Sequence, residues 1–304
     1  MHYRKFLQIA ATARPAFLLL TPCCLLLAVA YAVAQGVSLP GLTLALVFGG
    51  ALAAHISVNM FNEYEDFVSG LDLQTRRTAF SGGSGALPMA PELAEPVRTG
   101  AFIALAVTVL IGCYFLWLRG WGLLPLGLLG VVCIYFYTNT ITRRPMLCLI
   151  APGLAFGPLM VNGAFFVLTG EYQPAVIGAS LIVFFLVNNL LLLNQFPDQE
   201  ADRSVGRRHL PILIGKKYAA RVYVGFLASA YLILAADIAL GYLPFYSILG
   251  LLTLFLAIPA ATIAVLYYDD IEKLKTALAL NVAVTLTTPL LVALGIFLHH
   301  HLQA

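Results

Sequence analysis

Two segments of this sequence carry residue types that bind divalent cations, and each places an asparagine four residues before an aspartate. The first reads Asn62-Glu-Tyr-Glu-Asp66 and is followed by Gly70 and Asp72. Because glycine adopts backbone conformations that end a helix, Gly70 lets the chain leave a helix and bring Asp72 round from a loop. Carboxylate and amide oxygens are hard ligands of the kind that Mg²⁺ prefers. The first segment therefore supplies three candidate metal ligands, Asn62, Asp66 and Asp72.

The second segment reads Asn194-Gln-Phe-Pro-Asp198 and continues to Asp202. Asp198 and Asp202 are four residues apart, so both side chains can point the same way from one helix. When Asn194 is aligned with Asn62, the polar, aromatic and acidic positions of the two segments correspond. Such a correspondence is typical of an internal repeat in which each half supplies one acidic corner. Asn194, Asp198 and Asp202 are the candidate ligands of this second corner.

A polar stripe extends the first segment toward the N-terminus. Its members are spaced by four, three and four residues, which places them on one face of a helix: His55, Asn59, Asn62 and Asp66. A charge facing lipid at the centre of a membrane helix costs about 2.5–3.5 kcal/mol on insertion scales, so the stripe is predicted to face the interior of a bundle. For His55, packing or hydrogen bonding is favoured over metal ligation.

The two segments together predict a site for a magnesium-bound diphosphate. Bare carboxylates would repel a diphosphate, whereas Mg²⁺ held by them can bridge to the phosphate oxygens. Asp66, Asp198, Asn62 and Asn194 form the core of the site and are the candidate catalytic residues. Basic residues near the clusters can neutralise the remaining charge of the diphosphate, and these are Arg76, Arg77, Arg143, Arg144, Arg207, Arg208, Lys216 and Lys217.

Other interpretations compete with the diphosphate site. One acidic cluster alone would be an ordinary solvated loop, but two clusters with the same asparagine and aspartate spacing argue against that. A cation site in a transporter is an alternative, because carboxylates in membrane helices also mark ion pathways. Phosphotransfer from a nucleotide-linked donor is another, although the glycine, alanine and arginine core expected between its aspartates is not found in this sequence.

The composition points to lipid as the main solvent of the chain. Of its 304 residues 61% are apolar and 10% are charged, and the mean hydropathy is +0.91, whereas soluble domains are about 45–50% apolar and about 25% charged. The five cysteines have no metal-ligand spacing. The chain is predicted to form one all-α membrane domain over residues 1–304, with pseudo-repeat halves of about 1–145 and 146–304.

Nine apolar runs are long enough to cross about 30 Å of hydrocarbon. They cover residues 16–34, 42–61, 100–118, 121–138, 146–168, 174–195, 219–240, 244–267 and 276–298. The predicted fold is a bundle of nine transmembrane helices around a central cavity, with a cap of cytoplasmic loops. Pro152 and Pro158 lie inside the fifth run and predict a kink there.

The distribution of charge sets the predicted topology. With the N-terminus in the cytoplasm, every lysine and arginine except Arg119 falls on the cytoplasmic side, as the positive-inside rule requires. Every acidic residue except Glu171 and Asp237 lies on that side too. The expected location is the inner (cell) membrane, with the active site cytoplasmic and the C-terminus on the opposite side.

The two acidic segments resemble the Asp-rich motifs of the UbiA superfamily of intramembrane prenyltransferases, and the resemblance spans most of the chain. Three further segments are similar to the branch that prenylates 1,4-dihydroxy-2-naphthoate in menaquinone synthesis: Ser81-Gly-Gly-Ser-Gly-Ala-Leu-Pro88, Phe156-Gly-Pro-Leu-Met-Val-Asn-Gly163 and Leu213-Ile-Gly-Lys216. The sequence departs from the family pattern at Glu63, Arg207 and His209, where the family usually has Asp, Lys and Thr. It also lacks a Gly-Glu pair often seen in the fifth span of that branch.

The resemblance implies roles for particular residues and partners. It implies that Asn62, Asp66, Asp72, Asn194, Asp198 and Asp202 bind the Mg²⁺–diphosphate. It also implies that Tyr137, Arg143, Arg144, Arg207, Lys216 and Arg76 contact the diphosphate. The expected cofactor is Mg²⁺, and the expected partners are a prenyl diphosphate, an aromatic acceptor and membrane lipid, with no nucleic acid and no evident protein partner.

The implied reaction is electrophilic prenylation of an aromatic ring in a cavity that excludes water. The favoured acceptor is 1,4-dihydroxy-2-naphthoate, and a 4-hydroxybenzoate, homogentisate or chlorophyllide ring is the alternative. Aromatic side chains can stabilise an allylic cation through their π faces, and the candidates are Tyr31, Phe61, Tyr64, Tyr135, Tyr137 and Phe196.

Overall fold

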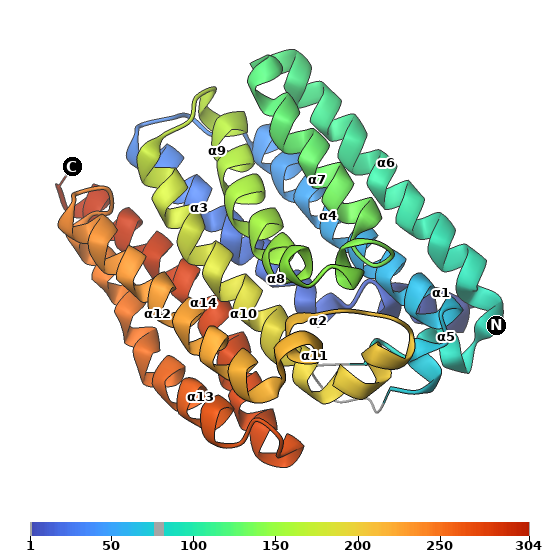
Figure 1. The fold of residues 1–304 in the computed structure, drawn as a ribbon. Coiled ribbons are helices and arrows are strands. Elements are labelled where there is room, and N and C mark those ends of the chain that lie inside the picture. The colour runs from blue at the N-terminus through green and yellow to red at the C-terminus, as the bar shows by residue number, and fades with distance from the viewer. Residues whose placement is uncertain (1, 76–81, 304) are drawn as a thin grey trace.

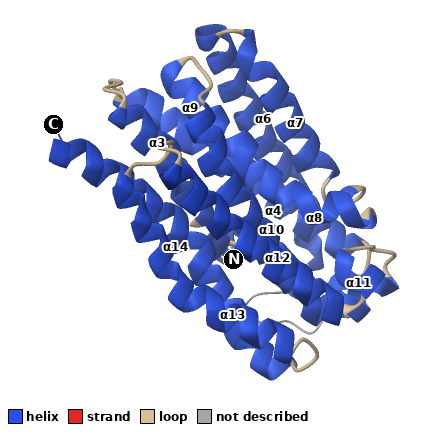
Figure 2. Cartoon of the chain, turned by 60° about the vertical axis from the view of Figure 1, so that its left-hand side comes forward, coloured by secondary structure: helices blue, strands red, loops and turns tan. Residues whose placement is uncertain are grey.

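The computed structural model describes residues 2–75 and 82–303, and within these ranges the chain consists of helices and loops with no strand (Figure 2). The long helices run side by side as one bundle (Figure 1). The α-helices are α1 (His2–Thr12), α2 (Pro15–Leu18), α3 (Leu20–Ala34), α4 (Gly41–Val68), α5 (Ala86–Met89), α6 (Ala94–Arg119), α7 (Leu124–Phe136), α8 (Pro145–Leu154), α9 (Asn162–Thr169), α10 (Pro174–Ser204), α11 (Leu210–Ile214), α12 (Lys216–Ala239), α13 (Leu254–Leu266) and α14 (Ile271–Gln303). The 3₁₀ turns are η1 (Leu71–Leu73), η2 (Pro91–Leu93), η3 (Trp121–Leu123), η4 (Ile141–Arg143) and η6 (Phe245–Thr253).

Eight helices in the described part of the chain are long and apolar enough to cross a membrane. They cover Pro15–Ala34, Gly41–Val68, Pro91–Arg119, Pro145–Thr169, Pro174–Ser204, Lys216–Ala239, Phe245–Leu266 and Ile271–Leu302. The fourth predicted span, 121–138, forms an apolar helix over Trp121–Phe136 that is shorter than these eight. The all-helical multi-pass membrane fold is therefore confirmed, whereas the predicted count of nine crossings is not.

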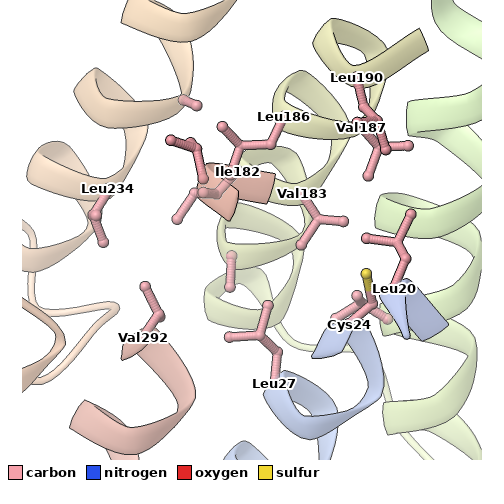
Figure 3. Close-up of a cluster of buried hydrophobic side chains, with 14 of the residues drawn as sticks. Leu20, Cys24, Leu27, Ile182, Val183, Leu186, Val187, Leu190, Leu234 and Val292 are labelled. Atoms are coloured by element: carbon pink, nitrogen blue, oxygen red, sulfur yellow. The ribbon is translucent and has the colours of Figure 1, made fainter. Parts of the chain in front are cut away.

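Helix α10 packs at the centre of the larger hydrophobic core, against α3, α8, α12 and α14. Figure 3 shows side chains from α10, including Val183 and Leu186, interleaved with Leu27 of α3, Leu234 of α12 and Val292 of α14. Each of these side chains is almost fully buried. Because lipid is as apolar as these residues, close packing rather than exclusion of water holds such helices together. The central position of α10 fixes the direction in which its acidic end points.

The proline-containing fifth span is continuous, but its middle is not an α-helix. A π-helical stretch, Ala155–Val161, joins α8 to α9 and contains Pro158, while Pro152 lies in α8. The Gly153 N–H donates to Oδ1 of Asn188 on α10 at 2.6 Å. A side chain of the neighbouring helix thus pairs a backbone group beside the proline, as the absence of water in a membrane interior requires.

Both acidic segments lie on the ends of long helices, except that Asp72 follows α4 on the turn η1. Helix α4 continues past the predicted end of its apolar run, to Val68, and α10 likewise continues to Ser204. The short helices α5 and α11 lie at the end of the bundle away from the C-terminus, and the two termini lie at opposite ends (Figure 1). The helices therefore carry the two segments to one end of the bundle.

Candidate active site

All six predicted metal ligands line one cavity of about 230 Å³. The first segment contributes Asn62 and Asp66 from α4 and Asp72 from the turn η1, and the second contributes Asn194, Asp198 and Asp202 from α10. Asp66, Asp72 and Asp202 are buried, although a charge is costly to bury without a partner. The tertiary structure thus gathers two segments that are far apart in the sequence around one polar cavity.

Arg207 joins the two segments directly. Its guanidinium donates to Oδ1 of Asp66, and its Nη1 donates to Oδ1 of Asp202 at 2.9 Å. Burial alone would lower the pKa of Arg207, but the carboxylates of Asp66 and Asp202 outweigh it and raise this pKa above its ordinary value. Nε2 of His209 lies 2.9 Å from the other oxygen of Asp202. A permanent side-chain cation therefore bridges the two clusters.

Glu63 fastens the first segment to two other parts of the chain. Its Oε1 accepts hydrogen bonds from Nε of Arg14 and from the backbone N–H of Ser84, both at 2.7 Å, and its Oε2 accepts one from the Ser84 hydroxyl at 2.5 Å. The Glu63 side chain is fully buried. Glu63 therefore serves as an anchor that holds the chain before α2 and the loop before α5 against the acidic end of α4.

Both predicted asparagine ligands have a side-chain oxygen for which no hydrogen bond is seen among the described residues. Nδ2 of Asn62 donates to the Thr138 hydroxyl at 3.3 Å, which leaves its carbonyl oxygen free to turn to the cavity. The Oδ1 atom of Asn194 is buried and accepts no hydrogen bond from any described residue. An orphaned buried oxygen in a cavity lined by carboxylates fits a hard cation such as Mg²⁺.

The carboxylates do not already converge on a single point. Among residues 2–75 and 82–303, no three acidic, histidine or cysteine side chains lie close enough together to hold one ion. Arg207 instead holds Asp66 and Asp202. The oxygen-bearing side chains of the cavity are of the kind that Mg²⁺ prefers, and Mg²⁺ usually takes only one or two protein carboxylates beside water and phosphate oxygens.

The residues predicted to contact the diphosphate are placed differently from one another. Tyr137 and Arg207 line the cavity. Arg143 and Arg144 are exposed on and beside η4 and do not line it. Nζ of Lys216 lies 3.5 Å from Asp269, in the loop before α14, and Lys216 is not part of the lining. Arg76 lies outside the described residues, as does Arg77.

Arg14 and Phe156 line the cavity although the spacing of the motifs does not place them there. Arg14 has a positive φ of 52°, unusual for a residue other than glycine. Of the aromatic candidates for stabilising a cation, Tyr137 alone belongs to this lining. The only signal for Arg14 in the sequence is its place before Pro15, ahead of the first span. Phe156 lies in the fifth span, between Pro152 and Pro158.

A second cavity of about 340 Å³ adjoins the first and is almost entirely apolar. Its walls come from α3, α4, α6, η3, α7, the π-helical stretch and α9. The polar cavity is lined by Asp66, Asp72, Asp198 and Asp202, whereas no acidic side chain of the described residues lines the apolar cavity. A ligand with a charged head and a hydrocarbon tail matches this pair.

Comparison with known proteins agrees with these features. The model of the UbiA prenyltransferase family matches residues 22–283, most of the chain. The chain belongs to this family. The 1,4-dihydroxy-2-naphthoate octaprenyltransferase of Bacillus subtilis (strain 168) is 32% identical over 63% of this chain, and the match spans 60% of that relative's length. Human UbiA prenyltransferase domain-containing protein 1 is 28% identical over 91% of this chain and 77% of its own length.

Solved structures share the UbiA fold at low sequence identity. An apo UbiA homologue from Aeropyrum pernix K1 has a TM-score of 0.66 and 18% identity, covering 92% of this chain and 97% of its own. A UbiA homologue from Archaeoglobus fulgidus, bound to GPP and Mg²⁺, has a TM-score of 0.60 and 14% identity, covering 94% and 99%. At these identities the likeness shows the fold, and the family membership rests on the sequence match.

Proposed function

We propose that this protein transfers a prenyl group from an allylic (poly)prenyl diphosphate to an aromatic ring, with Mg²⁺ as cofactor. The observation that carries the proposal is the polar cavity lined by six oxygen-bearing ligands from both acidic segments, which adjoins an apolar cavity. A prenyl diphosphate has a charged head and a long apolar tail in the same order. The Archaeoglobus fulgidus homologue was solved with GPP and Mg²⁺, which supports a donor and cofactor of this class.

In this proposal the six ligands, Asn62, Asp66, Asp72, Asn194, Asp198 and Asp202, hold the Mg²⁺–diphosphate. The metal supplies Lewis-acid stabilisation of the charge on the leaving diphosphate. Arg207 gives up its carboxylate partners and turns its guanidinium to the phosphate oxygens, for which its fork of donors is suited. Tyr137, protonated at neutral pH, donates a hydrogen bond to the same group. Four further basic residues are proposed to attract the diphosphate to the mouth of the site: Arg143, Arg144, Lys216 and Arg76.

The apolar cavity takes the prenyl tail and keeps water from the reacting carbon. Water would convert an allylic cation to an alcohol, so a dry wall protects the productive reaction. Phe156, which lines both cavities, can stabilise positive charge through its π face. At about 0.8 kcal/mol for each buried CH₂ group, a long prenyl chain does not leave lipid readily, and this explains an active site inside the membrane.

The acceptor we propose is 1,4-dihydroxy-2-naphthoate, and the product an intermediate of menaquinone synthesis. The support is the 32% identity to the Bacillus subtilis octaprenyltransferase, whose name states that acceptor. The Bacteriochlorophyll synthase 33 kDa chain of Cereibacter sphaeroides is 27% identical over 59% of this chain, so a chlorophyllide-type acceptor is the second candidate. Rings such as 4-hydroxybenzoate and homogentisate belong in the same test.

We also propose that the protein lies in the inner (cell) membrane with its N-terminus and active site in the cytoplasm and its C-terminus outside. The support is the gathering of basic residues on one side, since the positive-inside rule assigns that side to the cytoplasm. A single cysteine placed near either terminus, on a background without Cys113, would report the topology through labelling by a reagent that does not cross membranes.

The deciding experiment measures prenyl transfer by the purified full-length chain from a labelled prenyl diphosphate. It uses the acceptors above, each with and without Mg²⁺. Product with dihydroxynaphthoate, dependent on Mg²⁺, is the expected result. Product with another ring would change the acceptor and keep the reaction. The absence of product with every ring, together with ion flux in proteoliposomes, would favour a transporter.

A further inference from the structure

The place where the two cavities meet fixes where bond formation occurs in the proposed reaction. In a prenyl diphosphate the reacting carbon lies between the diphosphate and the hydrocarbon tail, so it must lie where the polar and apolar cavities adjoin. The residues that line both cavities are His55, Val58, Ile134, Ala155 and Phe156. Of these, His55 is the one with a side chain that can take or give a proton. A titratable group therefore stands at the predicted reaction centre.

The two ring nitrogens of His55 have different surroundings: Nδ1 contacts a residue outside both cavities, and Nε2 has no hydrogen-bond partner among the described residues. Its Nδ1 lies 2.9 Å from the Thr21 hydroxyl of α3, and Thr21 lines neither cavity. No hydrogen bond of its Nε2 with a residue in the described ranges is present. His55 is 6% exposed. Its ring lies edge to face with the Phe156 ring, and the two ring centroids are 4.8 Å apart. Thr21 and Phe156 thus fix the ring from two sides.

This arrangement suits a general base. When the Thr21 hydroxyl oxygen accepts from Nδ1–H, the lone pair of the neutral ring is on Nε2, the nitrogen available to the cavity. The same Thr21 oxygen can keep accepting from Nδ1–H after Nε2 gains a proton. A phenol attacks as a ring nucleophile far better when its O–H proton is removed, and dihydroxynaphthoate, hydroxybenzoate and homogentisate all carry such a hydroxyl.

We propose that His55 is a catalytic residue whose Nε2 takes the phenolic proton of the aromatic acceptor as the ring attacks. The inference rests on the prenyl transfer proposed above and adds a residue to it. The C–O bond to the diphosphate breaks and its electron pair leaves with the diphosphate. The O–H pair moves into the ring, a C–C bond forms, and the proton passes to Nε2. The resulting dienone loses its ring proton to the released diphosphate, or loses CO₂, and the ring oxygen regains its proton from His55.

The test compares His55→Gln with the wild type on two acceptors. One is the acceptor identified for the wild type, and the other is its ring-fluorinated analogue, whose hydroxyl is already ionised at the assay pH. With the ordinary acceptor, His55→Gln should lower kcat by about 10²–10⁴-fold, the usual contribution of a positioned base, with KM for the prenyl diphosphate unchanged. With the ionised acceptor, most of the lost rate should return.

Two further variants separate chemistry from folding. Thr21→Val keeps the shape of the side chain but removes the oxygen that fixes the tautomer, so it should give a smaller loss with the same recovery on the ionised acceptor. Ser57→Ala is the matched control, because Ser57 is a buried polar residue of α4 that bonds to the Ala101 carbonyl and lines neither cavity. Its kcat should match the wild type.

The outcomes distinguish this proposal from the proposed function. A wild type that prenylates no ring overturns both. A wild type that is active while His55→Gln keeps its kcat, or loses it equally with both acceptors, overturns the role of His55 alone. If His55→Gln does not fold, the recovery measured for Thr21→Val decides.

Discussion

The two acidic segments supply the same ligands to the cavity by different backbone routes. In the first, α4 ends after Val68, the chain turns at Gly70 with φ +76°, and Asp72 comes back from η1. In the second, all three ligands lie on α10, which ends at Ser204. The turn at Gly206, with φ +80°, follows the last ligand. The turn therefore positions a metal ligand in the first segment and positions Arg207 in the second.

The segments also differ in what holds them. Glu63 ties the first to Arg14 and Ser84, parts of the chain outside its helix. In the second, Asp202 is paired with residues that follow it closely, Arg207 and His209. The same pattern of ligands can therefore occur in both halves while different hydrogen bonds and ion pairs hold it in each half. Four predictions test this comparison, in order of decreasing expected effect.

The largest effect is expected from removing one charge in either segment. Asp66→Asn and Asp198→Asn should each abolish prenyl transfer, because the metal would lose an anionic ligand on one side. Both variants should still unfold cooperatively on heating in detergent. Glu200→Gln, on the exposed side of α10, is the matched control and should keep its turnover. Retained turnover in either aspartate variant would contradict the assignment of that segment.

The next effect concerns the bridge between the segments. Arg207→Met should lower the melting temperature without Mg²⁺, because Asp66 and Asp202 would face each other without a cation. Added Mg²⁺ should raise the melting temperature more in this variant than in the wild type. The increase for Arg207→Lys should be intermediate. Thermal unfolding with EDTA and with Mg²⁺ measures this. Equal gains from Mg²⁺ in all three proteins would show that the bridge and the metal use different places.

A smaller effect is expected at the anchor of the first segment. Glu63→Gln exchanges a carboxylate for an amide at the acceptor of three hydrogen bonds, and bonds to charged groups contribute about 1.5–3 kcal/mol each. The variant should be less stable and should bind the prenyl diphosphate more weakly, with kcat less affected. Glu65→Gln, two residues away on α4, is the control. A Glu63 variant as stable as this control would rule out the anchoring role.

The smallest effects are expected at the two turns. Gly70→Ala and Gly206→Ala should each cost about 1–2 kcal/mol of stability, since a side chain disfavours the left-handed conformation. An added Cβ meets no atom within 4 Å at either site, so the cost comes from the backbone alone. Gly70→Ala should also weaken Mg²⁺-dependent activity through Asp72, whereas Gly206→Ala should change activity through Arg207. Identical Mg²⁺ titrations for both variants would remove the distinction between the segments.

Local patterns predicted the helical fold, and the six predicted metal ligands line one cavity; that they bind a metal stays a prediction. Apolar runs specify helices because lipid leaves every backbone group to be paired within its own segment. The fourth run, 121–138, is the exception, since its helix is shorter than the apolar stretch suggests. The helical extent of the acidic ends, to Val68 and Ser204, agrees with the helical spacing of their polar residues, although each apolar run stops earlier.

The sequence by itself determined the apolar helices and the spacing that sets asparagine and aspartate on one helical face, because both follow from neighbours along the chain. Only the tertiary structure decided which charges meet. It set Arg207 between Asp66 and Asp202, drew Lys216 to Asp269, and brought His55 to the place where the two cavities adjoin. Asp66 and Arg207 are distant in the sequence, and so are Lys216 and Asp269. Such pairings depend on how the whole bundle packs and leave no local pattern to read.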